Sequence, residues 1–296
     1  MRRRIRHLIL LLLGMGLIVE FHHAQELLLP LKEKSVRFAV MGDSGSGKKG
    51  QYELAQRMVE YRQKFPFEFV IMLGDNIYGT NSSSAYTKKF ELPYKPLLDG
   101  GVKFYAALGN HDNPDQPLYM LFNMQNRYYT YTKGDIRLFV LDSNYMDPEQ
   151  LKWLERELQN SGSPWKICYF HHPLYSSGGA HGSDTDLRGL LEPLFVKYGV
   201  NVVFAGHDHF YERVRPQKGI YYFTSGSAGQ FRRGDIRHTE MTAKGFDQDL
   251  SFMIVEVSGD ELHFQVISRT GSSVDAGMIQ RTVPKVISSA PKLGGS

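Results

Sequence analysis

The stretch at residues 36–45 reads VRFAVMGDSG, and it joins an apolar run rich in β-forming residues to a short polar motif. It predicts a buried strand that ends at Gly42-Asp43. The same arrangement follows further predicted strands along the chain. Those motifs are GDNIY at 74–78, GNHD at 109–112, HHP at 171–173 and GHDH at 206–209.

The carboxyl ends of strands in α/β proteins meet at one rim, where ligands bind. Five polar motifs at such ends therefore predict several carboxylates and imidazoles in one small volume. Asp43 and Asp75 would repel each other there unless a cation lay between them. Mixed oxygen and nitrogen donors suit iron, manganese or zinc better than calcium or magnesium.

Histidine usage agrees with a metal site. Eight of the 11 histidines lie beyond residue 25, and six of these are in or beside the motifs. Each motif alone has a simpler explanation, because Asp-x-Gly after a strand is usually a turn or a helix cap. His-x-His on a strand places both rings on one face, which is a moderate metal signal. Five motifs in order are harder to explain by turns.

The surrounding pattern predicts an α/β fold. Further strands are expected at residues 136–141, 165–170, 221–224, 252–257 and 262–267. Helices are expected at 51–64, from residue 148 to a stop at Gly162 and Pro164, and at 187–198. Asp147 can cap the second helix, Pro148 suits its first position, and Gln150 would complete a capping box. Two central mixed sheets flanked by helices are expected, in one domain over residues 33–285, with a loose tail at 286–296.

The ordered motifs resemble those of the calcineurin-like metallophosphoesterases, and in particular the short, tartrate-resistant type of purple acid phosphatase. The resemblance covers about residues 36–270 and implies a four-layer α/β/β/α sandwich. It also implies two metal ions. The ligands that it implies for the first metal are Asp43, Asp75, Tyr78 and His209, and those for the second are Asp75, Asn110, His171 and His207.

The same resemblance implies a phosphomonoesterase. Fe(III) is expected at the first site, and Fe(II), Zn or Mn at the second, with Asp75 bridging. A metal-held hydroxide is expected to attack phosphorus, while His111 contacts substrate and His181 protonates the leaving group. His172 competes with its neighbour His171 for the ligand role, but alternation along a strand would turn it away.

Three other interpretations stay open. GDSGSGK at 42–48 matches a P-loop, although Lys49 replaces the magnesium-binding Ser or Thr. A manganese or zinc phosphodiesterase or nucleotidase of the same superfamily is the second, and Tyr78 argues against it. A catalytically inactive binding protein is the third, and it would not need all seven ligand positions.

The N-terminus predicts export. MRRRIRH precedes an apolar run from Leu8 to Val19, which is shorter than the roughly 20 residues of a membrane span. We expect a signal peptide over residues 1–25, cleaved near Ala24, and a periplasmic or extracellular protein; an uncleaved anchor is the alternative.

The composition limits the partners. The chain has 296 residues and a formal net charge of +4, but four of its 35 basic residues lie within the first six positions. The remaining chain is close to neutral, which gives no basic face for nucleic acid and no membrane partner beyond the signal. A small phosphate ester is the expected substrate, and the oligomeric state is left open.

Overall fold

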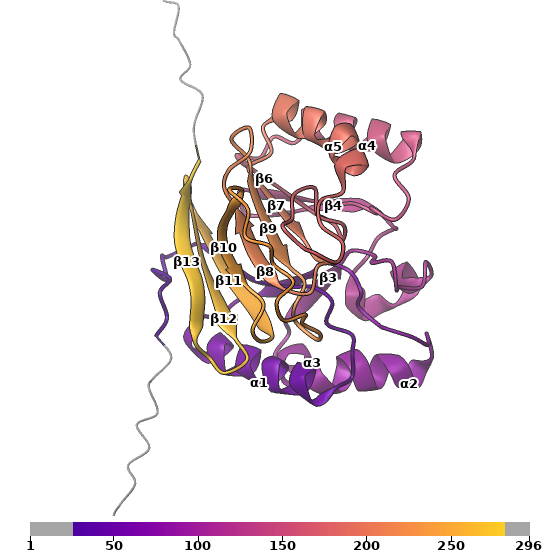
Figure 1. Cartoon of the computed structure of the whole chain (residues 1–296), viewed down its shortest axis with the longest axis vertical. Coiled ribbons are helices and arrows are strands. Elements are labelled where there is room, and N and C mark those ends of the chain that lie inside the picture. Colours follow the sequence, from indigo (N-terminus) through magenta and orange to yellow (C-terminus); the bar gives the residue numbers. More distant parts are fainter. Residues whose placement is uncertain (1–25, 282–296) are drawn as a thin grey trace, which may run out of the picture.

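The computed structural model describes residues 26–281, and within them two β-sheets pack face to face (Figure 1). The first sheet has six strands, in the order β13 (Ser273–Gln280), β12 (Glu261–Ser268), β11 (Ser251–Ser258), β1 (Val36–Met41), β2 (Phe69–Met72) and β3 (Lys103–Ala106). The second has seven, in the order β10 (Thr242–Phe246), β8 (Tyr211–Val214), β9 (Tyr221–Ser225), β7 (Val202–Ala205), β6 (Trp165–Tyr169), β5 (Ile136–Val140) and β4 (Tyr129–Lys133).

Each sheet combines a block of parallel strands with antiparallel strands beside it; in the first sheet the parallel block reaches the edge strand β3. β1, β2 and β3 run parallel in the first sheet, and β5, β6, β7 and β9 run parallel in the second. The carboxyl ends of these parallel strands carry the motifs that were singled out from the sequence. The expectation of two central mixed sheets is confirmed.

Helices cover the outer face of each sheet, which gives the expected four layers. α1 (Lys49–Lys64) and α3 (Leu92–Asp99) lie on the side of the first sheet, while α4 (Pro148–Gln159) and α5 (Thr185–Tyr198) lie on the side of the second (Figure 1). Shorter turns complete the helical part: α2 (Ser83–Tyr86), the π-helical η1 (Thr87–Glu91), and the 3-10 helices η2 (Gln116–Leu118) and η3 (Met120–Phe122).

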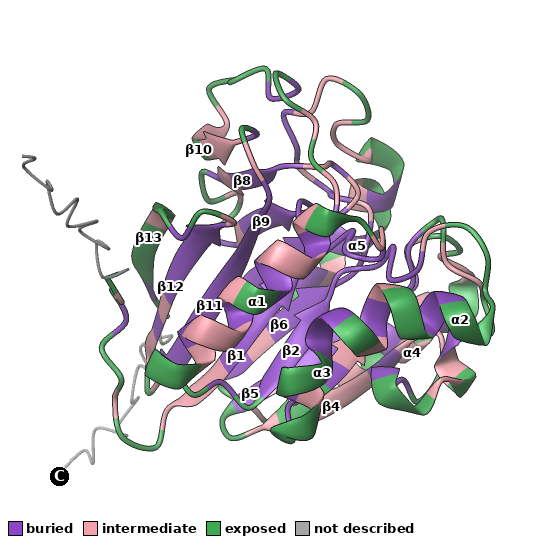
Figure 2. Cartoon of the chain, turned by 90° about the horizontal axis from the view of Figure 1, so that it is seen from below, coloured by how far each residue is buried: buried purple, intermediate pink, exposed green. Residues whose placement is uncertain are grey.

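The core follows from the apolar stripes of these elements. Leu54, Met58 and Tyr61 are buried on α1, where Tyr61 meets Phe252 of β11 edge to face. Leu154 and Leu158 of α4 pack in a second cluster between the seven-stranded sheet and its helices. Figure 2 shows the strands buried and the outer sides of the helices exposed.

The start of α4 corrects one detail of the prediction. Asp147 accepts a hydrogen bond from the Gln150 backbone, as a capping residue does. The side chain of Gln150 does not return to Asp147, however. It is buried and bonds both the backbone N–H and C=O of Asp142, so the box is only half formed. Gln150 instead ties the helix to the end of β5.

Several elements escaped the sequence pattern. These are α2, η1, α3, β4, β8, β10 and β13. β4 lies in a tyrosine-rich stretch that alternates weakly, and its strand character comes from pairing with β5. β13 has mostly exposed side chains and is held by its ladder with β12.

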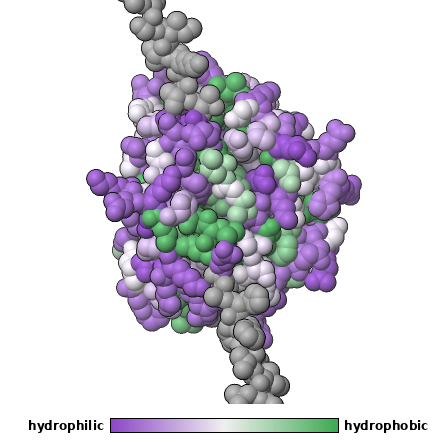
Figure 3. All heavy atoms as spheres, turned by 90° about the vertical axis from the view of Figure 1, so that its left-hand side faces the viewer, coloured by the Kyte–Doolittle hydropathy of each residue, from purple (hydrophilic) through white to green (hydrophobic). Residues whose placement is uncertain are grey.

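The outer face beside β12 and β13 carries a small apolar area. Figure 3 shows green apolar groups near the middle of this side, among hydrophilic ones. Leu28 and Met278 are exposed on this part of the chain, and the Leu28 N–H donates to Gln265 of β12. The backbone around Leu28 is thus attached to the sheet.

Two predictions fall outside the described residues: the signal peptide at 1–25 and the tail at 286–296. The domain boundaries at 33 and 285 also stay predictions. Among residues 26–281, no helix has the length and apolar character needed to cross a membrane.

Candidate metal centre

The predicted site residues converge at the carboxyl ends of the parallel strands. Asp43 follows β1, Asp75 follows β2, and Asn110 follows β3. His171 follows β6 in the other sheet, and the turn after β7 provides the last two imidazoles, those of His207 and His209. Both sheets therefore contribute side chains to one rim.

A first group of donors consists of Asp43, Asp75, Tyr78 and His209. The ligand atoms of Asp43, Asp75 and His209 all lie within 4.8 Å of one another. The Tyr78 hydroxyl is 3.2 Å from Oδ1 of Asp43 and 3.1 Å from Nε2 of His209. Oxygen donors dominate this group.

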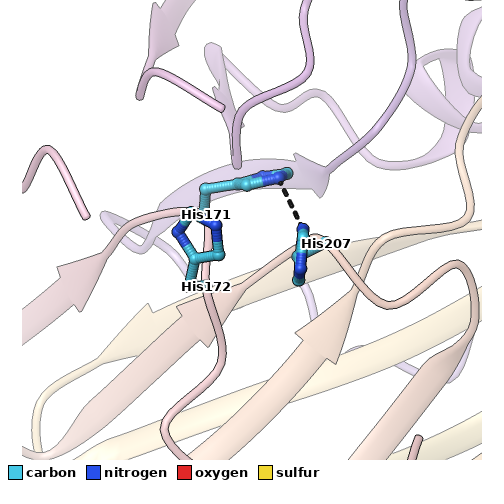
Figure 4. A group of neighbouring side chains, drawn as sticks. All are labelled: His171, His172 and His207. Carbon is cyan, nitrogen blue, oxygen red and sulfur yellow. Dashed lines mark hydrogen bonds between the residues drawn. The ribbon is translucent and has the colours of Figure 1, made fainter. Parts of the chain in front are cut away.

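A second group consists of Asn110, His171 and His207. Oδ1 of Asn110 is 2.8 Å from Nε2 of His171 and 3.1 Å from Nδ1 of His207. The two imidazole nitrogens are themselves 3.1 Å apart. Figure 4 marks this contact with a dashed line. The other nitrogen of His171, Nδ1, donates its hydrogen to the Leu73 carbonyl, 2.9 Å away, which fixes the ring orientation.

Asp75 links the two groups. It belongs to the first group, and its Oδ1 lies 3.5 Å from Nε2 of His171 in the second. The backbone N–H of His111 donates to the same oxygen at 2.9 Å. The carboxylate is 1% exposed, so it faces the rim from within the protein.

The backbone at three of these positions is unusual for residues that have a β-carbon. Asp43, Asp75 and His207 have positive φ angles of 55°, 51° and 69°. This left-handed conformation is rare outside glycine, asparagine and aspartate, and it concentrates at functional sites. Each residue follows a glycine at a strand end, so the strain accompanies the turn that aims the side chain at the rim.

Glycines let these turns pass close to one another. A β-carbon on Gly109 would lie 2.1 Å from the Asp75 backbone nitrogen, and one on Gly206 would lie 2.6 Å from Oδ2 of Asp43. Gly74 has φ of +90°, and a β-carbon there would lie 2.7 Å from Nδ1 of His171. The glycines of the motifs are therefore required by packing around the ligand groups.

Burial dominates the electrostatics of both groups. Burial and the nearby Asp75 carboxylate raise the pKa of Asp43 well above its usual value. Burial and the neighbouring imidazoles lower the pKa of His171 well below its usual value and that of His207 to about 2. Burial raises the pKa of the Tyr78 phenol, with the charges of Asp43 and Asp75 adding to the shift. Neutral imidazoles with free lone pairs are what a metal requires.

The two predicted non-ligand histidines also reach the rim. His111 is exposed, and its ring centroid lies 5.1 Å from that of Tyr78. His181 is exposed on the loop before α5, and its ring centroid lies 4.2 Å from that of His207. His111 thus borders the first donor group, and His181 borders the second.

His172 lies nearer the second group than strict strand alternation predicts. β6 ends at Tyr169, so residues 171 and 172 are not in a strand and need not alternate. The ring centroid of His172 is 4.5 Å from that of His207, and one of its nitrogens lies within 4.8 Å of ligand nitrogens of His171 and His207. Its Nδ1 lies 2.9 Å from the Ser143 hydroxyl, which occupies one of its two nitrogens.

Two carboxylates with structural roles were missed from the sequence, the half-buried Asp112 and the buried Asp208. Asp112 accepts from the backbone N–H groups of Asn76, Ile77 and Gly109, and so joins two of the motif loops. Burial raises the pKa of Asp112 to about 7. Asp208 lies between two predicted ligands and is fully buried. An acidic residue inside a ligand motif was the available signal for both.

The P-loop interpretation does not fit the geometry of residues 42–48. Asp43 joins the first donor group, and the Gly47 N–H donates to the side chain of Gln51 at 2.7 Å. Lys48 is exposed. The Gly47 amide, which would cradle phosphate in a P-loop, is therefore bonded to Gln51 instead.

Comparison with known families agrees with this arrangement. A family model described as calcineurin-like phosphoesterase matches residues 36–211, more than half of the chain. Tartrate-resistant acid phosphatase type 5 of Rattus norvegicus is 24% identical, over 84% of this chain and 94% of the relative. Purple acid phosphatase 3 of Arabidopsis thaliana is 28% identical, over 80% and 76%.

Solved structures confirm the fold. The purple acid phosphatase PPD1 from yellow lupin seeds aligns with a TM-score of 0.72 at 19% identity, over 84% of this chain and 54% of that one. GAP50, described as the anchor in the inner membrane complex of Plasmodium, aligns with a TM-score of 0.75 at 21% identity, over 85% and 90%. Proteins described in such different terms share the fold, so the function must be argued from the site.

Proposed function

The chain belongs to the calcineurin-like phosphoesterase family, and from this membership we propose that it is a phosphomonoester hydrolase of the acid phosphatase type. One observation carries the proposal: the two donor groups meet at Asp75 on a single rim. Its relatives among the tartrate-resistant and purple acid phosphatases support the same reaction class.

The donor atoms fit two metal ions. Two buried carboxylates without a cation would repel each other, and a shared Asp75 allows one ion on each side. Asp43, Asp75, Tyr78 and His209 would hold the first ion, and Asp75, Asn110, His171 and His207 the second. We propose Fe(III) for the oxygen-rich first site and Fe(II), Zn or Mn for the second. When bound, such a pair neutralises phosphate charge and acidifies water for attack on phosphorus.

His111 and His181 would orient the ester and transfer protons. The backbone N–H of His111 donates to Asp75, so the backbone that carries the ring is held beside the first group. We propose that its N–H donates to a phosphate oxygen as charge develops. His181, beside His207, would give a proton to the departing alkoxide.

Purified protein provides the test. Metal content, the visible absorption spectrum, and the turnover of 4-nitrophenyl phosphate against bis(4-nitrophenyl) phosphate should be measured together. We expect two metal ions per chain, a visible band from tyrosinate on ferric iron, and faster turnover of the monoester. A metal-replete, folded protein that hydrolyses neither ester, or only the diester, would overturn the proposal.

We also propose that the protein is exported, which rests on the basic and apolar pattern of residues 1–25. Cell fractionation of the full chain against a chain that begins at Gln25 tests this. Phosphatase activity outside the cytoplasm only for the full chain is expected. Equal distribution of the two chains would contradict export.

A further inference from the structure

The loop at residues 176–183 carries His181, and its two ends are bonded together. The Ser176 N–H donates to the Ser183 hydroxyl at 2.9 Å, and that hydroxyl donates to the Ser176 carbonyl at 3.1 Å. We call this segment the His181 loop. Closing its neck fixes where the loop begins and ends, but does not fix the position of its tip.

The tip of the His181 loop is held by hydrogen bonds to Asp208. The Ser176 hydroxyl and the Gly182 N–H both donate to Oδ2 of this carboxylate, the second at 3.3 Å. The Ser176 hydroxyl oxygen also accepts from the Gly178 N–H at 3.1 Å. Asp208 therefore organises the loop on both sides of His181, and directly at the residue that follows it.

Gly178 shows how closely the loop lies on the carboxylate. A β-carbon at Gly178 would lie 2.5 Å from Oδ2 and 2.6 Å from Oδ1 of Asp208. Oδ1 is buried and has no hydrogen-bond partner among residues 26–281. Only glycine permits this approach. A side chain at residue 178 would separate the loop from the Asp208 carboxylate and move the tip of the loop away from the rim.

Asp208 lies between His207 and His209, one from each donor group. The turn that delivers these imidazoles therefore also anchors the loop that carries His181, whose ring lies 4.2 Å from that of His207. We infer that Asp208 is a positioning residue that acts through Ser176 and Gly182 to hold His181 over the leaving-group oxygen. This rests on the proposed phosphomonoesterase function.

Substitution of Ser176 tests the inference without altering a predicted ligand or its neighbour. Ser176→Ala, His181→Ala and the double variant should be compared on phenyl phosphate, a poor leaving group, and 4-nitrophenyl phosphate, a good one. Thr185→Ala is the matched control, because Thr185 is an exposed hydroxyl residue just outside the loop.

We expect His181→Ala to slow phenyl phosphate about 100-fold, the lower range for loss of a general acid, and the nitrophenyl ester less than about threefold. Ser176→Ala should slow phenyl phosphate about tenfold through misplacement of the acid, with the nitrophenyl ester and the metal content unchanged. In the His181→Ala background, Ser176→Ala should add nothing. Thr185→Ala should match the wild type on both esters.

Three results would overturn the inference: equal losses on both esters, losses that add in the double variant, or a fall in metal content. A wild type that hydrolyses neither ester would instead overturn the proposed function, and this inference with it. If Ser176→Ala does not fold, amide hydrogen exchange in the metal-free wild type decides. Slow exchange at Gly182 supports the bond to Asp208, and exchange as fast as at Gly162, an exposed loop residue, contradicts it.

Discussion

The two donor groups of the rim differ in chemistry although they share one carboxylate. The first offers two carboxylates, a phenol and one imidazole, while the second adds an amide oxygen and two imidazoles to the shared Asp75. An anionic oxygen set favours a hard cation of high charge, and a neutral nitrogen set favours a borderline divalent one. If the site holds the two ions that we propose, these donor sets would suit two different ones.

The difference follows from the topology. The first group draws its oxygens from the ends of β1 and β2 in the six-stranded sheet. The second draws His171 from the end of β6 in the other sheet, and Asn110 from the end of β3. Residues 207–209 reach both groups from one turn, so their geometry couples the two halves.

Loss of the shared carboxylate should have the largest effect. Asp75→Ala removes a donor from both groups, and we expect catalytic efficiency to fall about 1,000-fold, since a metal contributes several kcal/mol to the transition state. Activity and metal content by mass spectrometry measure it. Asp99→Ala, at an exposed and paired carboxylate on α3, is the control. Retention of both ions in Asp75→Ala would show that the groups are independent.

Gly74→Ala should have the next largest effect, and it should affect the second donor group more than the first. Gly74→Ala places a β-carbon 2.7 Å from Nδ1 of His171 in a position with φ of +90°. We expect the second ion to be lost preferentially and activity to fall about 100-fold through misplacement, with about 2 kcal/mol lost from the free energy of unfolding.

Gly162→Ala is the matched control for Gly74→Ala. Its φ is +67°, but nothing lies within 4 Å of an added β-carbon. It should cost about 1 kcal/mol through the left-handed backbone alone and leave activity intact. Chemical denaturation and activity assays on both variants measure the difference. Equal effects would mean that the contact with His171 is unimportant.

The phenol should matter more for colour than for rate. Tyr78→Phe leaves Asp43, Asp75 and His209 in the first group, so we expect both ions to stay bound. The visible band should disappear while activity falls about tenfold or less, the size of one lost charge-assisted contact of about 1.4 kcal/mol. A band that survives in Tyr78→Phe would exclude tyrosinate as its source.

The smallest effect should come from His172. One of its nitrogens already contacts Ser143, 2.9 Å away, and the second group has its donors without it. His172→Ala should keep two ions per chain and lose about threefold in activity, since it borders the second group without completing it. A loss of one ion in His172→Ala would instead make it a ligand of the second group.

Much of this could be predicted from local sequence. Each strand that bears a motif was visible as an apolar run, and in four of the five motifs a glycine after the strand marked a turn. The resemblance of the ordered motifs to a known family was confirmed by the match over residues 36–211. Asp43, Asp75 and His207 were recognisable because their chemistry and their strand-end positions are local properties.

Other features required the folded chain. β13 and β4 owe their form to partner strands rather than to their own alternation. The sequence marks Gln150 as a capping residue. In the folded chain its side chain instead hydrogen-bonds the backbone of Asp142, just after the end of β5. The place of His172 depended on where β6 stops.

The sequence by itself determined the donor set, since residue type and strand-end position decide which side chains can bind a cation. The resemblance already implied two donor sets that share Asp75. Only the tertiary structure gave the distances within each set and the contacts of Asp208 with the His181 loop. Some of these distances join residues more than 160 positions apart in the chain, as in the Asp43 contact with the His207 backbone, across 164 positions. Such distances follow from strand order and register, which short-range pattern does not encode.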